Sequence, residues 1–151
     1  MEKVIEIQNY LPHRAPMLMV DLILSMNHET VNTVFTVKED NIFIENGRLS
    51  EFGLIENAAQ TCSAIVAKSY FVDDADQDIS NVDVIGFISS IKTIKIHALP
   101  QQGCDIHTTA SLLSRFDTGF YTTCMMSCKA YCGEELLLEG EINLFIQETA
   151  K

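Results

Sequence analysis

Basic residues are scarce in this sequence. Its 151 residues include 10 lysines and arginines against 21 acidic residues, which gives a formal net charge of -11 at pH 7. A chain this acidic repels phosphate backbones and anionic membrane surfaces. We therefore expect neither nucleic acid nor a membrane among its partners.

Long apolar runs are also missing. The longest candidate, residues 54–72, carries Glu56 and Lys68, whereas a membrane span needs roughly 18 uncharged apolar residues. The opening residues, MEKVIEIQNYL, lack the apolar core of a signal peptide. The sequence therefore predicts a soluble, cytoplasmic protein.

The cysteines do not follow a metal-binding or disulfide pattern. There are 5 of them and no CxxC pair, although Cys124, Cys128 and Cys132 recur every four residues. Their segment is rich in aromatics and threonine, which favours a strand, and on a strand neighbours in this series lie about 13 Å apart. That distance excludes a shared zinc ion or a disulfide within the series. We expect reduced cysteines that act as small apolar fillers.

Motifs of several common enzyme classes are absent as well. The chain has no GxSxG, P-loop or GxGxxG sequence, which leaves serine hydrolase, nucleotidase and Rossmann dehydrogenase functions without support. The 4 histidines are dispersed and give no metal-ligand spacing. No metal ion or cofactor is expected.

What the sequence does contain predicts one domain over residues 1–151. Residues 54–71 place apolar side chains at helical spacing with very few charges, so this helix is expected to have protein on most sides. The acidic stretch 73–83 reads as a solvated loop. The order β-β-α-β-β-β-β predicts an α+β fold in which an antiparallel sheet packs on one long helix. The strands are expected at residues 17–26, 30–38, 82–98, 105–114, 120–131 and 135–147.

Glu56 is the most informative charge, because it stands alone in the apolar helix. Burial makes a carboxylate costly to ionise, and a carboxyl group that keeps its proton is suited to general acid catalysis. Gln60 lies one turn further on the same face and is placed to orient Glu56. Gly53 lies near the helix start, where free backbone N–H groups can polarise a carbonyl oxygen. The alternative is that Glu56 is simply paired at a contact with a partner helix.

A second candidate segment is Leu-Pro-His-Arg-Ala-Pro-Met at residues 11–17. Two prolines stiffen the chain around His13 and Arg14, and histidine exchanges a proton near neutral pH. The alternative is a surface turn that carries a solvated histidine.

These residues resemble a known family. LPHRAPMLMVD (residues 11–21) and GLIENAAQT (residues 53–61) resemble the opening segment and the central helix of the hotdog-fold 3-hydroxyacyl-(acyl carrier protein) dehydratases. FISSIKTIKIHALPQQGCDI (residues 87–106) resembles the strand and turn that follow. Among these proteins the sequence is most similar to the dehydratase-like branch associated with aryl polyene or flexirubin-type pigment synthesis. The resemblance implies a hotdog fold, a dimer formed by edge-to-edge joining of two sheets, and an acyl tunnel at the dimer interface.

The resemblance also implies roles for residues. The family removes water from a 3-hydroxyacyl thioester to give a 2-enoyl thioester. A histidine of one subunit takes the C2 proton, and an acid on the other subunit's helix helps the hydroxyl group leave. Here Glu56 matches the acid, Gln60 matches the helix glutamine, and Gly53 lies near the N–H that binds the carbonyl. Arg14, next to His13 in the same segment, is a further substrate-binding candidate.

One departure from the family pattern bears on catalysis. The family histidine stands about fourteen residues before the acid, but residues 40–47 (DNIFIENG) contain none. Asn41 is nearest in position, as a substrate-binding candidate, and its amide is no base. Either His13 takes the proton, or the chain is a non-catalytic acyl-binding subunit of a heteromeric dehydratase. A hotdog thioesterase, which also uses a helix acid, is a third possibility.

The carrier of the acyl group is left open by the sequence. Acyl carrier proteins are acidic, so docking one on this acidic chain needs a local basic patch. If the basic residues scatter, a coenzyme A thioester is favoured instead. The candidates for that patch are His13, Arg14, Lys92, Lys95 and Arg115.

Overall fold

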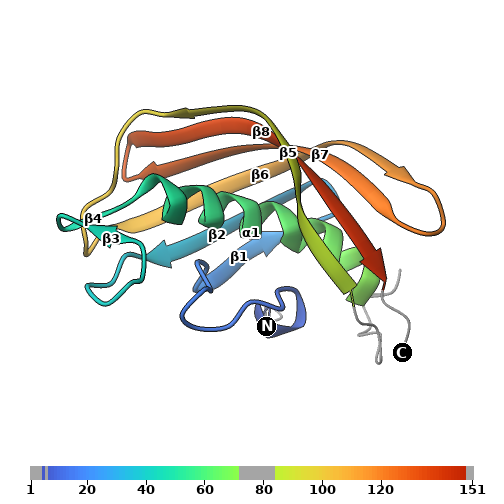
Figure 1. The fold of residues 1–151 in the computed structure, drawn as a ribbon, viewed down its shortest axis with the longest axis horizontal. Coiled ribbons are helices and arrows are strands. Elements are labelled where there is room, and N and C mark those ends of the chain that lie inside the picture. Colours follow the sequence, from blue (N-terminus) through green and yellow to red (C-terminus); the bar gives the residue numbers. More distant parts are fainter. Residues whose placement is uncertain (1–4, 6, 72–83, 149–151) are drawn as a thin grey trace.

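A computed structural model describes residues 5, 7–71 and 84–148 (Figure 1). Its elements are a 3-10 turn (Ile7–Asn9), β1 (Leu22–Met26), β2 (Thr30–Thr36), β3 (Ile44–Glu45), β4 (Arg48–Leu49), α1 (Glu51–Phe71), β5 (Val84–Ile96), β6 (Asp105–Asp117), β7 (Thr122–Cys132) and β8 (Glu135–Glu148).

Six strands form one antiparallel sheet in the order β1-β2-β6-β7-β8-β5. The sheet curves around α1, which crosses its inner face and contacts β2, β6 and β7 most (Figure 1). β1 and β5 are the two edges. This architecture confirms the predicted α+β fold, with one long helix and six strands in the predicted chain order.

Side chains of the strands alternate between the buried face that packs on the helix and the outer face. In β2, Val31, Thr33 and Phe35 are buried, while Asn32 and Val34 between them are half-buried. Small helix residues such as Ala58 and Cys62 are fully packed and let α1 approach the sheet closely. Asn57 and Thr61 are also buried and form hydrogen bonds with Thr108 of β6 and Thr33 of β2. The expectation that α1 has protein on most sides is thus confirmed.

The first strand is shorter than the sequence indicated, because residues 17–21 do not join the sheet as a regular strand. Helix side chains bind this backbone instead. The Gln60 amide donates to the Met17 carbonyl oxygen (2.9 Å) and accepts from the Met19 N–H (2.7 Å). The Asn57 amide donates to the Met19 carbonyl oxygen at 2.7 Å. A hydrophobic run that looks like a strand is therefore anchored to the helix.

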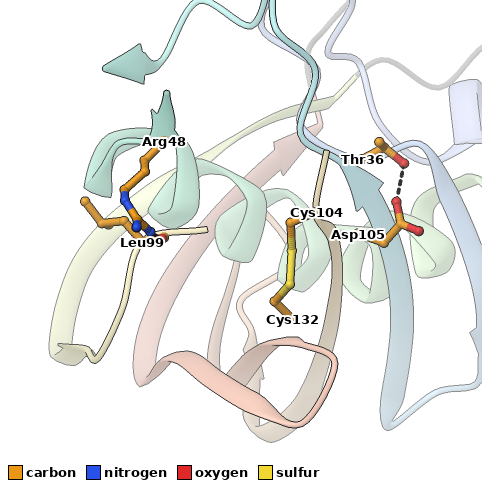
Figure 2. The surroundings of a disulfide bond; sticks show 6 residues. All are labelled: Thr36, Arg48, Leu99, Cys104, Asp105 and Cys132. Carbon is orange, nitrogen blue, oxygen red and sulfur yellow. Dashed lines mark hydrogen bonds between the residues drawn. A yellow bond between two sulfur atoms is a disulfide. The ribbon is translucent and has the colours of Figure 1, made fainter. Parts of the chain in front are cut away.

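A small two-stranded ribbon, β3–β4, precedes the helix and was not predicted. It turns at Asn46 and Gly47, which both have positive φ (52° and 75°). Asn-Gly is the sequence signal for such a tight hairpin, so this ribbon could have been found from the sequence. Its Arg48 donates to the Leu99 carbonyl oxygen at 2.8 Å, which ties the ribbon to the loop before β6 (Figure 2).

The cysteine prediction is wrong for two of the five residues. Cys104 and Cys132 form a disulfide, with their Cα atoms 6.4 Å apart (Figure 2). Cys104 immediately precedes β6, and the β6–β7 register sets Ile106 opposite Cys132, so strand pairing brings the two sulfurs together. The prediction weighed only the series with four-residue spacing, which omits Cys104. Cys62, Cys124 and Cys128 are free and buried, as expected of apolar fillers.

The acidic stretch 73–83 lies outside the described residues. Among the helices that are described, none is long and apolar enough to cross a membrane.

Candidate functional site

A cavity of about 240 Å³ lies between the N-terminal segment, α1 and the two strands at one edge of the sheet. Its apolar wall comes largely from β5 and β8, and its polar groups come from α1 and His13. The residues that line it are Tyr10, Pro12, His13, Glu56, Ala59, Gln60, Ser63, Gly86, Phe87, Ile88, Leu144 and Ile146.

Glu56 projects from α1 into this cavity. Its side chain is 29% exposed, so it is less buried than the sequence suggested, because it faces the cavity. Gln60 Nε2 donates a 3.0 Å hydrogen bond to Glu56 Oε1. The predicted pairing of these two residues along one helix face is thus present in the structure.

Gln60 is itself held rigidly. It is 1% exposed, and all its amide positions point at fixed partners: Met17, Met19 and Glu56. An amide whose oxygen accepts a backbone N–H has its NH2 group oriented without ambiguity. Gln60 therefore presents an N–H to Glu56 whatever the state of the carboxyl group.

His13 enters the cavity from a turn that Arg14 stabilises. The Arg14 guanidinium donates to the carbonyl oxygens of Leu11 (2.7 Å) and His13 (2.8 Å), which fixes the backbone around the imidazole. His13 Nε2 lies 3.8 Å from Glu56 Oε1 of the same chain. Burial lowers the pKa of His13, opposed by the Glu56 carboxylate and assisted by the positive Arg14. The imidazole is therefore largely neutral at pH 7.

Three other predicted site residues do not line the cavity. Gly53 is buried at the helix start, where an added Cβ would lie 2.8 Å from Phe43 Cβ, so its small size serves packing against the β3–β4 ribbon. Asn41 accepts a hydrogen bond from the Phe43 N–H (2.9 Å) and so stabilises a turn. Arg14 is exposed, and its guanidinium donates to the Leu11 carbonyl oxygen in its own turn.

Several cavity residues were not singled out from the sequence. Tyr10 and Phe87 supply aromatic surface, and Ser63 lies one turn after Gln60 on the cavity side of α1. The Ser63 hydroxyl donates to the Gln60 carbonyl oxygen at 2.9 Å. Helical spacing from Glu56 and Gln60 would have identified Ser63, whereas no local signal connects Phe87 with the helix.

The candidate basic patch is divided between elements. Lys92 pairs with Glu141 at 3.4 Å and Arg115 with Asp117 at 3.8 Å. Lys95 stands opposite Glu139 in the β5–β8 register. Of the five candidates, His13 alone lines the cavity. Within the described residues, no three His, Cys, Asp or Glu side chains are grouped to hold a metal ion.

Comparison with known proteins places the chain in a family. The sequence profile of the ApeP-like family, described as ApeP dehydratase, matches residues 5–151. No curated protein matches the sequence.

Solved structures agree on the hotdog fold. The dehydratase heterocomplex ApeI:P from Xenorhabdus doucetiae matches with a TM-score of 0.77 and 19% identity, over 99% of this chain and 94% of that chain. A hypothetical thioesterase solved with coenzyme A from Streptococcus pneumoniae matches with a TM-score of 0.61 and 14% identity, over 85% and 87%. Cj0977, a sigma28-regulated virulence protein of Campylobacter jejuni, matches with a TM-score of 0.64 and 13% identity, over 93% and 82%.

Proposed function

We propose that this chain, which belongs to the ApeP-like dehydratase family, acts as a hydro-lyase subunit on 3-hydroxyacyl thioesters. One observation carries the proposal. A carboxyl group, Glu56, projects into an apolar cavity, is oriented by Gln60 and is faced by the imidazole of His13. An acid in an apolar, shielded pocket beside a second titratable group is the arrangement that general acid–base chemistry requires.

The proposed reaction moves two protons. A base takes a proton from C2 of the thioester, and the electron pair of that C–H bond forms the C2–C3 double bond. The C3–O bond breaks as Glu56 gives its proton to the departing hydroxyl group, which leaves as water. The product is a 2-enoyl thioester. The apolar wall formed by Ile88, Leu144 and Ile146 suits the acyl chain.

Two sources of the base follow from the sequence. In a self-sufficient enzyme His13 takes the C2 proton. In a heteromeric enzyme a second hotdog chain supplies the base, because residues 40–47 contain no histidine. Asn41, the nearest residue in position, is engaged by the Phe43 N–H.

The edge strand β5 supports a paired assembly. β5 is the last strand of the sheet, and its Gly86, Phe87 and Ile88 border the cavity (Figure 1). Its exposed Phe87 (54%) and Ile91 (46%) are large apolar side chains on an unpaired edge, which invites strand pairing. We propose that a second hotdog chain pairs along β5 and completes the cavity wall. Similarity to a chain of the ApeI:P heterocomplex favours a different hotdog protein over a second copy.

The second candidate function is a non-catalytic acyl-binding subunit, favoured by the missing family histidine. A hotdog thioesterase is the third, and the likeness to the hypothetical thioesterase from Streptococcus pneumoniae extends to the fold only.

The decisive assay uses the purified chain alone and mixed with a hotdog dehydratase from the same source. Hydration of a 2-enoyl thioester is followed by loss of the conjugated absorbance, with the acyl group on coenzyme A or on a carrier protein. We expect turnover that Glu56→Gln abolishes. Activity of the chain alone supports a self-sufficient enzyme, and activity of the mixture alone supports a heteromeric one. Release of free thiol indicates a thioesterase, and wild-type activity equal to that of Glu56→Gln in every mixture rejects the dehydratase.

A further inference from the structure

The two ring nitrogens of His13 lie in unlike surroundings. Nε2 faces Glu56 Oε1 at 3.8 Å. Nδ1 is fully buried and makes no hydrogen bond within the described part of the chain. Since burial holds the imidazole neutral, it carries a single proton, and the two surroundings decide which nitrogen has it.

Placing the proton on Nδ1 has two costs. A buried N–H without an acceptor loses its hydrogen bond to water and gains none. In addition, the bare Nε2 would then direct its lone pair at the oxygen of a carboxyl group that is itself rich in lone pairs. Placing the proton on Nε2 costs less. The N–H then lies on the side of a carboxyl oxygen 3.8 Å away, and the buried nitrogen keeps an unpaired lone pair, which is better tolerated than a buried N–H without an acceptor.

We infer that His13 keeps its proton on Nε2, on the side of Glu56, and positions that carboxyl group, rather than serving as the base that takes the C2 proton. The nitrogen that faces Glu56, Nε2, already carries the proton, and the bare nitrogen, Nδ1, is buried, so neither is placed to take a proton from the substrate. This inference rests on the proposed dehydratase function and refines it. The base is then a group of a second chain.

The same geometry tells the two oxygens of Glu56 apart. The donors Gln60 Nε2 (3.0 Å) and His13 Nε2 (3.8 Å) both lie on the Oε1 side. No donor from the described residues contacts Oε2. An oxygen that already accepts a hydrogen bond is a poor place for a proton, so in the proposed reaction Oε2 is the oxygen that carries the proton given to the leaving hydroxyl group. His13 and Gln60 thus act through Glu56 as positioning residues.

The tautomer can be measured directly on the full chain without substrate. Long-range ¹H–¹⁵N correlation of the histidine rings, with His13 assigned by its absence in His13→Gln, distinguishes a protonated, pyrrole-like nitrogen from a bare, pyridine-like one. We expect a pyrrole-like Nε2 and a pyridine-like Nδ1 at neutral pH. A pyrrole-like Nδ1, or a charged ring, would overturn the inference. Because no turnover is involved, this result is independent of whether the proposed reaction takes place.

A matched pair of variants tests the role in the active assembly. The amide N–H of a glutamine can replace Nε2–H as a donor, whereas leucine cannot, and neither is a base. We expect His13→Gln to lower kcat by about tenfold and His13→Leu by about a hundredfold, within the range that one donor at a reacting site contributes. Equal losses of a thousandfold or more in both variants would instead identify His13 as the base.

Discussion

Gln60 donates a hydrogen bond to Glu56 while its own oxygen accepts the Met19 backbone N–H, so one buried amide joins the proposed acid to the N-terminal segment. The segment that carries His13 and the helix that carries Glu56 are thereby fixed to each other.

Replacing Gln60 by glutamate breaks the bridge with little change of shape. The new carboxylate still accepts from the Met19 N–H, but it has no N–H to donate. It therefore faces the Met17 carbonyl oxygen and the Glu56 carboxyl group without a hydrogen bond to either. We expect the free energy of unfolding at pH 7 to fall by about 2–3 kcal/mol, as for a buried group left without its partners. The loss should shrink at lower pH, where the carboxyl pair takes up a proton. Urea unfolding at several pH values measures this, with exposed Gln147→Glu as the control. Equal stability of the two variants would contradict it.

Asn57 forms a second connection between helix and sheet. Its amide donates to the Met19 carbonyl oxygen (2.7 Å) and accepts from the Thr108 hydroxyl (2.6 Å), all buried. Asn57→Ala leaves the buried Met19 carbonyl oxygen and the buried Thr108 hydroxyl without this hydrogen-bond partner. We expect a loss of about 2–4 kcal/mol in unfolding free energy.

A matched control exists on the outer face of the sheet. Asn32 likewise donates to one residue, Ser25 (2.8 Å), and accepts from another, Thr109 (2.7 Å), but in solvent contact. Asn32→Ala should cost less than about 1 kcal/mol, because water replaces the lost bonds. If thermal unfolding shows that Asn32→Ala and Asn57→Ala lose equal stability, burial is not the reason that the Asn57 hydrogen bonds stabilise the fold.

Patterns within one segment were predictable from the sequence, and contacts between distant segments were not. Helical spacing predicts Glu56 and Gln60 on one face, and strand alternation with turn residues predicts the order of the strands along the chain. Nothing local shows that residues 17–19 bind the amide of Gln60 rather than a strand, because that bond joins positions 41 and 43 residues apart. The same limit hid the pairing of Cys104 with Cys132, which only the β6–β7 register reveals. The contribution of Phe87 to the cavity wall is a third contact between distant segments that no local pattern predicts.

The lowered pKa of His13 makes stability depend on pH in one direction. In the unfolded chain the imidazole takes a proton near its usual pKa of about 6.5, whereas burial lowers the pKa of the folded form. Below pH 6.5 the unfolded state therefore binds more protons, and the free energy of unfolding falls as the pH falls; above that value this contribution is fully present. The groups that oppose or reinforce the shift are Glu56 and Arg14, respectively.

Urea unfolding between pH 5 and pH 8 tests this dependence. His13→Gln should lose less stability than the wild type as the pH is lowered over this range. His107→Gln, at an exposed strand position, should retain the wild-type slope. A slope that is identical in His13→Gln and the wild type would show that His13 is not shielded in the folded chain.

The Cys104–Cys132 disulfide predicts a stability that depends on reductant. It joins residues 28 apart in the sequence, and closing a loop of that length restricts the unfolded chain by an amount worth about 3–4 kcal/mol. We expect a thiol reductant to lower the unfolding free energy of the wild type by up to this amount. The double variant Cys104→Ser/Cys132→Ser should be weakened to a similar extent and should not respond to reductant. Cys124→Ala, which alters a buried free thiol, should keep the response. A wild type that is equally stable with and without reductant would show that this bond does not restrain the unfolded chain.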